Sequence, residues 1–293
     1  MTETFLYLAV KIVITGATIV AASVAAERAG PLIGGIIIAL PVSAGPGYVF
    51  LARQASDAFI SRSALYSFGV TAITAIFLAV YVRIAPFLGA VASVAIGLAA
   101  WTLLAALLQH VGLAWWSALL LNLASFAFCL RVTRERAGTT LPAARALSLR
   151  DLVLRALLAG TLVAVVVTVS DLIGPRLTGS TITFPVTLTT LGLIMHWRYG
   201  GAVAARALRG ALVAMPCFAA SVLTLHLLAV PLGAARALLA ALGVSLAAST
   251  AYLGFGRIRA RHRQAAMAGA RLGAAPDRGA FAESASHSRR ASP

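Results

Sequence analysis

Two short apolar segments combine proline with hydroxyl side chains, a combination suited to binding a small polar solute inside a membrane. The segments are IIIALPVSAGPGYVF, residues 36–50, and TITFPVTLTTLGLIM, residues 181–195. A proline inside a helix removes one backbone hydrogen bond and obstructs another, and in lipid the freed carbonyl needs a new partner. Such interrupted helices form the central site of many transporters. The residues predicted to line a path are Pro41, Ser43, Gly45, Pro46, Pro185, Thr187 and Thr189.

The same prolines have a structural interpretation, in which they kink two helices so that these fit a bundle. The two interpretations make different predictions for Ser43 and Thr187, each two residues after a proline. In a transport path the two hydroxyls face one another or a shared cavity. In a packing role they are buried without solute access, against backbone.

Four ionisable residues near the ends of apolar segments are candidate coupling or charge sites: Lys11, Glu27, Arg155 and Asp171. An ionisable group at membrane depth is costly and often functional. Glu27 and Asp171 could couple a proton or cation, and the two basic residues could pair with a carboxylate or an anionic substrate. Alternatively, the acids lie in solvated turns and the long basic side chains extend to the membrane surface.

Other chemistry-bearing patterns are lacking in the sequence. It contains no HExxH, GxxxxGKS or GxSxG motif, which disfavours the corresponding metalloprotease, nucleotide and hydrolase sites. Cys129 and Cys217 have no CxxC spacing, and the histidines have no metal-ligand spacing. We therefore expect no enzymatic activity, no cofactor and no metal site.

The composition requires the bilayer as solvent. Hydrophobic residues make up 60% of the 293 residues and charged residues 11%, and the mean hydropathy is +0.94, which leaves too little polar surface for a soluble globule. Apolar stretches of about 20 residues, enough to span a bilayer as helices, recur along the chain. Because further spans follow the first one, we expect it to be a retained span and not a cleaved signal peptide. Nine spans are predicted, at residues 5–26, 31–52, 60–82, 86–108, 112–130, 152–172, 174–196, 205–228 and 232–254.

The arginines predict how the spans are oriented. The connector at residues 131–151 holds five arginines and the tail from Gly256 holds eight, so both should be cytoplasmic. Four predicted spans separate them, an even number, as a shared side requires. The N-terminus is then outside and the C-terminus cytoplasmic, in the cell (inner) membrane.

The net charge of +16 is explained by this orientation, and no nucleic-acid partner is expected. Residues 256–263 are expected to lie on anionic lipid of the inner leaflet. The rest of the tail lacks apolar periodicity and is expected to be disordered.

The sequence repeats itself at an offset of 144 residues. RAGPLIGGIIIALPVS, residues 28–43, aligns without a gap with LIGPRLTGSTITFPVT, residues 172–187. The matches are mostly glycine, proline and charged residues, which chance in an alanine- and leucine-rich chain would not favour. Each copy covers four predicted spans, so the unmatched span at 112–130 reverses the second copy and gives an inverted repeat. The predicted parts are residues 1–108, first repeat; 109–148, linker helix and basic loop; 149–254, second repeat; and 255–293, tail.

The repeated unit resembles the small four-helix inner-membrane proteins of the GlpM type and their uncharacterised relatives. The resemblance is carried by a basic residue early in the first span, an acid just before Gly-Pro, and GGxxxxLP at the start of the second span. It implies an all-α, polytopic architecture, here in duplicated form. It implies no particular activity or substrate.

These patterns predict an all-α membrane protein of about nine helices that transports or exports an unidentified small solute by alternating access. The path would lie between the second and seventh spans. The competing hypothesis is a non-transporting scaffold or accessory subunit, in which the repeat serves packing alone. A lipid-modifying membrane enzyme is a third hypothesis, and it would need an acid, histidine or arginine cluster at one membrane surface.

Overall fold

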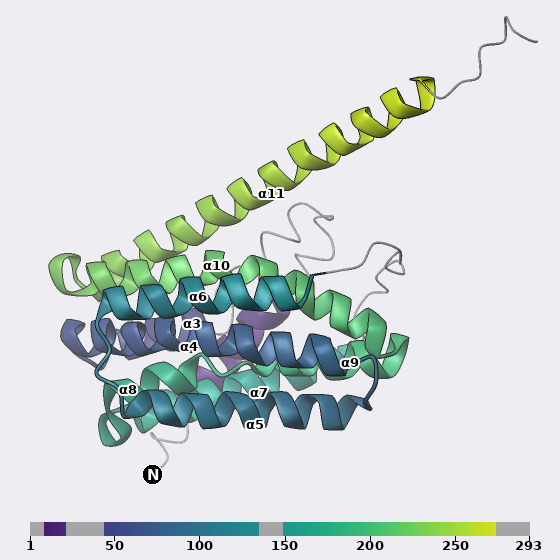
Figure 1. Cartoon of the computed structure of the whole chain (residues 1–293). Coiled ribbons are helices and arrows are strands. Elements are labelled where there is room, and N and C mark those ends of the chain that lie inside the picture. Colours follow the sequence, from purple (N-terminus) through teal and green to yellow (C-terminus); the bar gives the residue numbers. More distant parts are fainter. Residues whose placement is uncertain (1–8, 22–43, 135–148, 274–293) are drawn as a thin grey trace, which may run out of the picture. The chain divides into compact units, whose positions relative to one another are not determined.

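The computed structural model describes residues 9–21, 44–134 and 149–273, and every regular element in these ranges is an α-helix. This confirms the all-α prediction for the described part. After the helix Ala9–Ala21, the elements are α3 (Ala44–Leu51), α4 (Asp57–Ile84), α5 (Ala90–Gln109), α6 (Trp115–Val132), α7 (Leu149–Thr168), α8 (Ser170–Ile182), α9 (Val186–Tyr199), α10 (Gly201–Leu232) and α11 (Ala234–Gly273) (Figure 1).

The chain is a multi-pass helical membrane protein by the length and hydropathy of its helices. Six helical stretches are long and apolar enough to cross a bilayer: Asp57–Ile84, Ala90–Gln109, Trp115–Val132, Ser170–Tyr199, Gly201–Leu232 and Ala234–Tyr252. Two shorter apolar helices, Ala9–Ala21 and Leu152–Thr168, lie within the first and sixth predicted spans. Most of the second predicted span lies outside the described residues, so the count of nine stays a prediction.

The chain divides into two compact units, residues 1–250 and 251–293. The first unit is a helical bundle, and it contains the first predicted repeat and the second as far as residue 250. In the second unit the backbone stays helical as far as Gly273, whereas disorder was expected from residue 264. The difference has a local cause, because QAAMAGARL is rich in good helix formers and extends a helix that is already nucleated.

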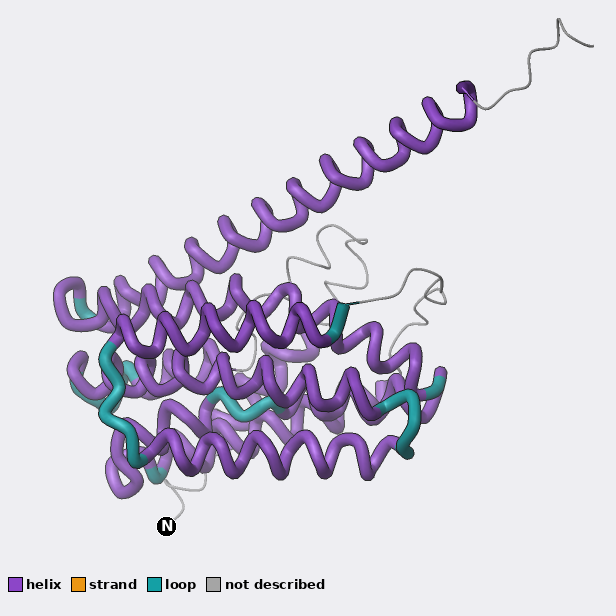
Figure 2. The backbone as a smooth tube through the Cα atoms, viewed as in Figure 1, coloured by secondary structure: helices purple, strands orange, loops and turns teal. Residues whose placement is uncertain are grey.

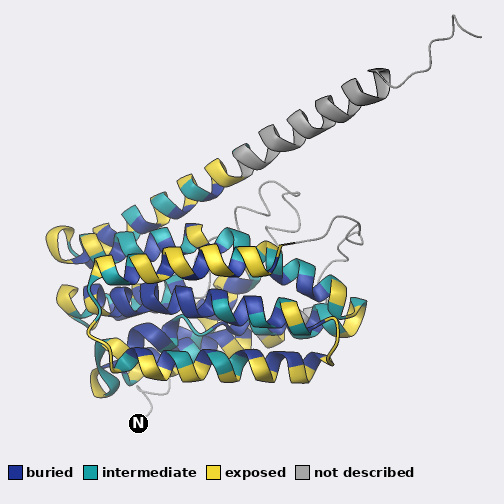
Figure 3. Ribbon diagram, in the orientation of Figure 1, coloured by how far each residue is buried: buried dark blue, intermediate teal, exposed yellow. Residues whose placement is uncertain are grey.

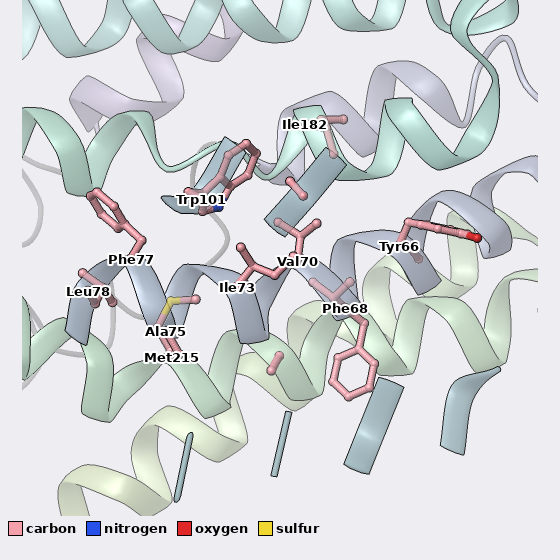
Figure 4. Close-up of a cluster of buried hydrophobic side chains, with 14 of the residues drawn as sticks. Tyr66, Phe68, Val70, Ile73, Ala75, Phe77, Leu78, Trp101, Ile182 and Met215 are labelled. Atoms are coloured by element: carbon pink, nitrogen blue, oxygen red, sulfur yellow. The ribbon is translucent and has the colours of Figure 1, made fainter. Parts of the chain in front are cut away.

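Helix α4 is the centre of the bundle. It packs against α5, α6, α8 and α10, and 83% of its most apolar window is buried (Figure 3). Its side chains Phe68, Ile73 and Phe77 belong, with Trp101 of α5, to one cluster of buried hydrophobic residues (Figure 4). By contrast, α5 and α6 carry exposed leucines on their outer faces, as expected for helices that contact lipid.

Glycines allow the helices to approach α4 closely. A Cβ atom added to Gly179 of α8 would collide with the backbone of Ser63, and one added to Gly201 of α10 would collide with the carbonyl of Ala85. Small residues at such crossings are typical of membrane bundles, where packing rather than the hydrophobic effect holds helices together.

Apart from the loop between α8 and α9, the helix junctions lie at two ends of the bundle, as Figure 2 shows. At one end Gln54 donates hydrogen bonds to the Val167 carbonyl (2.5 Å) and Ser170 Oγ (3.2 Å), and the Ala234 amide donates to Asp57 Oδ1 (2.8 Å). At the other end Arg209 Nε donates to the Thr133 carbonyl (2.5 Å). The ends of α4, α6, α7 and α10 therefore alternate as the order of the predicted spans requires.

One pair of helix contacts is reciprocal at the offset of the sequence repeat. A Cβ on Gly16 would lie 3.4 Å from Ala156 Cβ, and a Cβ on Gly160 would lie 2.8 Å from the Ile12 carbonyl oxygen. Gly16 and Gly160 are 144 positions apart, and so are Ile12 and Ala156. Where the helix Ala9–Ala21 crosses α7, the glycine of each helix therefore faces the residue four positions before the glycine of the other.

Candidate functional site

The apolar stretch Ser170–Tyr199, which contains the seventh predicted span, is interrupted at two places. The first is at Gly174, whose φ of +72° is accessible to glycine without strain. The kink lies at the predicted boundary between the sixth and seventh spans. The preceding helix, α7, ends earlier, at Thr168. The second is between Ile182 and Val186, where α8 stops and α9 starts (Figure 2, the teal stretch within the bundle).

Pro185 occupies the residue immediately before α9. It has no amide hydrogen to continue α8, and its ring disfavours a helical conformation at Phe184. Phe184 instead donates its amide to the Thr181 carbonyl at 3.0 Å, and Val186 donates to the Phe184 carbonyl at 2.8 Å. The predicted interruption at Pro185 is therefore present, as a complete break rather than a kink within one helix.

Hydroxyl groups of α4 and of the break itself satisfy the Gly179 carbonyl, which lies one turn before the break. The Gly179 carbonyl accepts hydrogen bonds from Ser67 Oγ of α4 at 2.6 Å and from Thr183 Oγ1 at 3.0 Å. Ser67 Oγ also lies 2.6 Å from the Tyr48 hydroxyl of α3. Because Ser67 has one hydroxyl hydrogen and donates it to Gly179, Tyr48 is the donor in that bond.

The aromatic side chain of the break, Phe184, packs against α5. Phe184 packs edge-to-face against Trp101 of α5, with ring centroids 5.0 Å apart. The Trp101 indole N–H donates to Thr74 Oγ1 of α4 at 3.1 Å. Phe184 also packs against the buried residues Ile19 and Val186, so the break connects the helix Ala9–Ala21 with α4 and α5.

The two predicted path segments approach one another, but only part of the first can be described. Pro41 and Ser43 lie outside the described residues, so the predicted meeting of Ser43 and Thr187 is untested. Gly45 and Pro46 are half-buried in the first turn of α3, where proline costs no helical hydrogen bond. Two residues later, a Cβ on Gly47 would lie 2.5 Å from Ile182 Cδ1, at the end of α8.

The threonines after Pro185 lie on the first turn of α9. Thr187 is half-buried, and its carbonyl accepts a hydrogen bond from Thr190 Oγ1 at 3.1 Å. Thr189 Oγ1 is buried and has no hydrogen-bond partner within the described residues. A buried hydroxyl in this state costs free energy unless water or a solute satisfies it.

Of the predicted charge sites, Lys11 and Asp171 have described side chains, and both lie away from the break. Lys11 is buried, and its ammonium donates to Thr168 Oγ1 at 3.2 Å, at the end of α7. Asp171 is exposed near the start of α8. Arg155 lies on α7 with its side chain outside the described set, and Glu27 lies wholly outside the described residues.

The sequence analysis did not single out several polar residues that the fold buries in the core. Asn122 of α6 donates to the Phe68 carbonyl at 2.8 Å and accepts from Thr71 Oγ1 at 2.6 Å, and Ser61 donates to the His226 carbonyl at 2.8 Å. A usable signal was the spacing of Ser67, Thr71 and Thr74, which places them on one face of α4.

The arrangement offers hydroxyls and backbone carbonyls, which suit hydrogen bonding to a small polar solute or an ion, whereas the Trp101 N–H is already donated to Thr74. In the described residues no three histidine, cysteine, aspartate or glutamate side chains gather as metal ligands. No protein-family model, curated protein or solved structure was found to match the chain. The resemblance to GlpM-type proteins therefore stays a prediction.

Proposed function

We propose that the chain is a secondary transporter or exporter of a small polar solute, with its central site at the break between α8 and α9. The proposal is carried by one observation: a helix of membrane-spanning length stops at Ile182 and restarts at Val186, beside hydroxyls of α3 and α4. Interrupted helices of this kind supply unpaired backbone groups for solute binding in transporters. They are tolerated in a membrane only where protein or a water-filled cavity surrounds them.

An inverted repeat supports alternating access. The reciprocal contacts of Gly16 and Gly160 are those expected between helices related by a two-fold axis. The matched helices α4 and α10 run antiparallel, because Asp57 at the start of α4 bonds Ala234 just after α10, and Gly201 at the start of α10 contacts Ala85 just after α4. Two halves related in this way can exchange conformations and open the centre to each side in turn.

The proposed orientation places the N-terminus outside and the basic connector and tail in the cytoplasm, with the tail on anionic lipid. Reporter fusions at residues 131–151 and in the tail test it. Activity of both fusions on the cytoplasmic side is expected. Opposite locations for the two would contradict the inverted repeat.

A scaffold or accessory role is the second candidate, and a specific observation favours it. Thr183 bonds the carbonyls of Gly179 and Ser180, and Thr190 bonds those of Val186 and Thr187. The hydroxyls of Thr183 and Thr190 thus have backbone partners in α8 and α9 without any solute.

Single-cysteine labelling distinguishes the two roles. Thr187→Cys and Ser43→Cys are introduced after both native cysteines are replaced by alanine, and a membrane-impermeant maleimide is applied from each side. Transport predicts that both positions react and that a candidate solute slows the reaction. Gly112→Cys, in an exposed connection, is the reactive control, and Leu120→Cys, on the lipid-facing side of α6, is the unreactive control. Protection of both test positions from both sides would favour the scaffold.

A further inference from the structure

A pocket lies at the end of the bundle where α4 begins, α5 ends and α7 meets α8. Its polar lining comes from Arg62, Gln109 and Arg176, and its apolar lining includes Ile173 and Leu177. The two arginines belong to helices that are far apart in the sequence, so only the fold brings them to one pocket. From this geometry we propose that the pocket binds a phosphate-bearing anion at the membrane surface.

Arg176 is held in place by the surrounding helices. Its Nη1 donates to the Gln109 carbonyl at 2.9 Å, and its guanidinium lies 5.4 Å from the centroid of the Tyr66 ring, a cation–π contact. Tyr66 is itself fixed, because its hydroxyl donates to the Val111 carbonyl at 2.9 Å. A guanidinium carries five N–H donors, so most of those of Arg176 remain for a ligand.

Within the described residues, no carboxylate pairs with the arginines of the pocket. Neither Arg62 nor Arg176 forms an ion pair in the described part of the chain. Asp57, the acid nearest to Arg62 in the sequence, accepts the Ala234 amide instead. The helical segment that follows Gly174 also starts at the pocket, and the positive end of its dipole adds to the potential.

A phosphate group fits this lining better than a carboxylate or a halide. Two planar guanidiniums can each bond a pair of oxygens on one tetrahedral phosphate. The apolar residues beside them suit a phosphate attached to a hydrocarbon, as in an anionic phospholipid headgroup, and Leu172 next to the pocket is 87% exposed. Free inorganic phosphate shares the same chemistry without the apolar contact, and the test separates these sources.

The test measures binding to the purified full-length protein in neutral detergent by calorimetry. The ligands are dihexanoylphosphatidylglycerol, dihexanoylglycerol without phosphate, and inorganic phosphate. The phospholipid is expected to bind, and the double variant Arg62→Gln/Arg176→Gln is expected to bind it at least about tenfold more weakly, which is about 1.4 kcal/mol. Higher salt should also weaken binding, because the arginines are exposed.

Matched controls make the result specific to the pocket. Arg53→Gln and Arg236→Gln remove exposed arginines from the same end of the bundle without touching the lining, and both should bind like the parent. Binding of inorganic phosphate with the same dependence on Arg62 and Arg176 would support a free anion as the ligand. Equal binding of dihexanoylglycerol, or equal losses in the control variants, would overturn the proposal.

If the double variant does not fold, Arg62→Lys replaces it, because Arg62 is exposed and its replacement leaves the core intact. The charge is kept and the guanidinium fork is lost. A several-fold weaker affinity for the phospholipid is expected, and an unchanged affinity would overturn the bidentate site.

Discussion

Ser67 Oγ donates a hydrogen bond of 2.6 Å to the Gly179 carbonyl oxygen, across 112 residues of sequence. This bond joins the most buried helix of the bundle to the helix that stops at Ile182. Tyr48 completes the arrangement by donating to the same Ser67 oxygen. A side chain of α4 therefore satisfies a carbonyl near the break and connects it to α3.

Ser67→Ala should destabilise the protein by about 1–3 kcal/mol, because the buried Tyr48 hydroxyl loses its acceptor and the Gly179 carbonyl loses a donor. Ser63→Ala is the matched control, since Ser63 is equally buried on α4 and its Oγ has no partner among the described residues. Unfolding in mixed detergent micelles measures both. Equal losses for the two variants would show that the bond between Ser67 and Gly179 contributes nothing.

Gly179→Ala should be more damaging, because the added methyl group collides with the backbone of Ser63 rather than with a flexible side chain. The helices must separate, at a cost of about 1–3 kcal/mol or more. Gly210→Ala in α10 has no atom within 4 Å of the new Cβ and should be neutral or stabilising, because alanine favours helix. Thermal unfolding in detergent compares them. A neutral Gly179→Ala would mean that α4 and α8 are not in close contact.

Gly160→Ala and Gly16→Ala test the crossing of the helix Ala9–Ala21 with α7. At Gly160 the new methyl lies 2.8 Å from a backbone oxygen, whereas at Gly16 the nearest atoms are 3.4 Å away. Gly160→Ala is therefore expected to lower the unfolding temperature, and Gly16→Ala to leave it equal or raise it. The opposite order would contradict this crossing.

Pro185→Ala should allow α8 and α9 to join, since it restores an amide donor and removes the ring. If the break forms the central site, the rate at which the impermeant maleimide labels Thr187→Cys should fall in this background while the fold is retained. Pro231→Ala, near the end of α10, is the control and should leave the rate unchanged. An unchanged rate in Pro185→Ala as well would separate solute access from the break.

The sequence by itself determined that the bilayer is the solvent of the helices and where these helices are interrupted. Hydropathy is a local property, so apolar stretches of spanning length identified the membrane helices from Asp57 onward. Proline and glycine act on their own backbone, so the break at Pro185 and the kink at Gly174 were also predictable. The arginine pattern further predicted the alternation of the helix ends.

The tertiary structure decided which polar groups meet. A serine in an apolar helix has no local sign of its partner, so the pairing of Ser67 with Gly179 and of Thr71 with Asn122 depends on how helices cross. The central burial of α4 has the same origin, because its hydropathy resembles that of its lipid-facing neighbours. Arg62 and Arg176 likewise line one pocket only because α4 and α8 pack side by side. Helix formation follows from the nearest residues and the solvent, whereas these contacts follow from the packing of helices far apart in the chain.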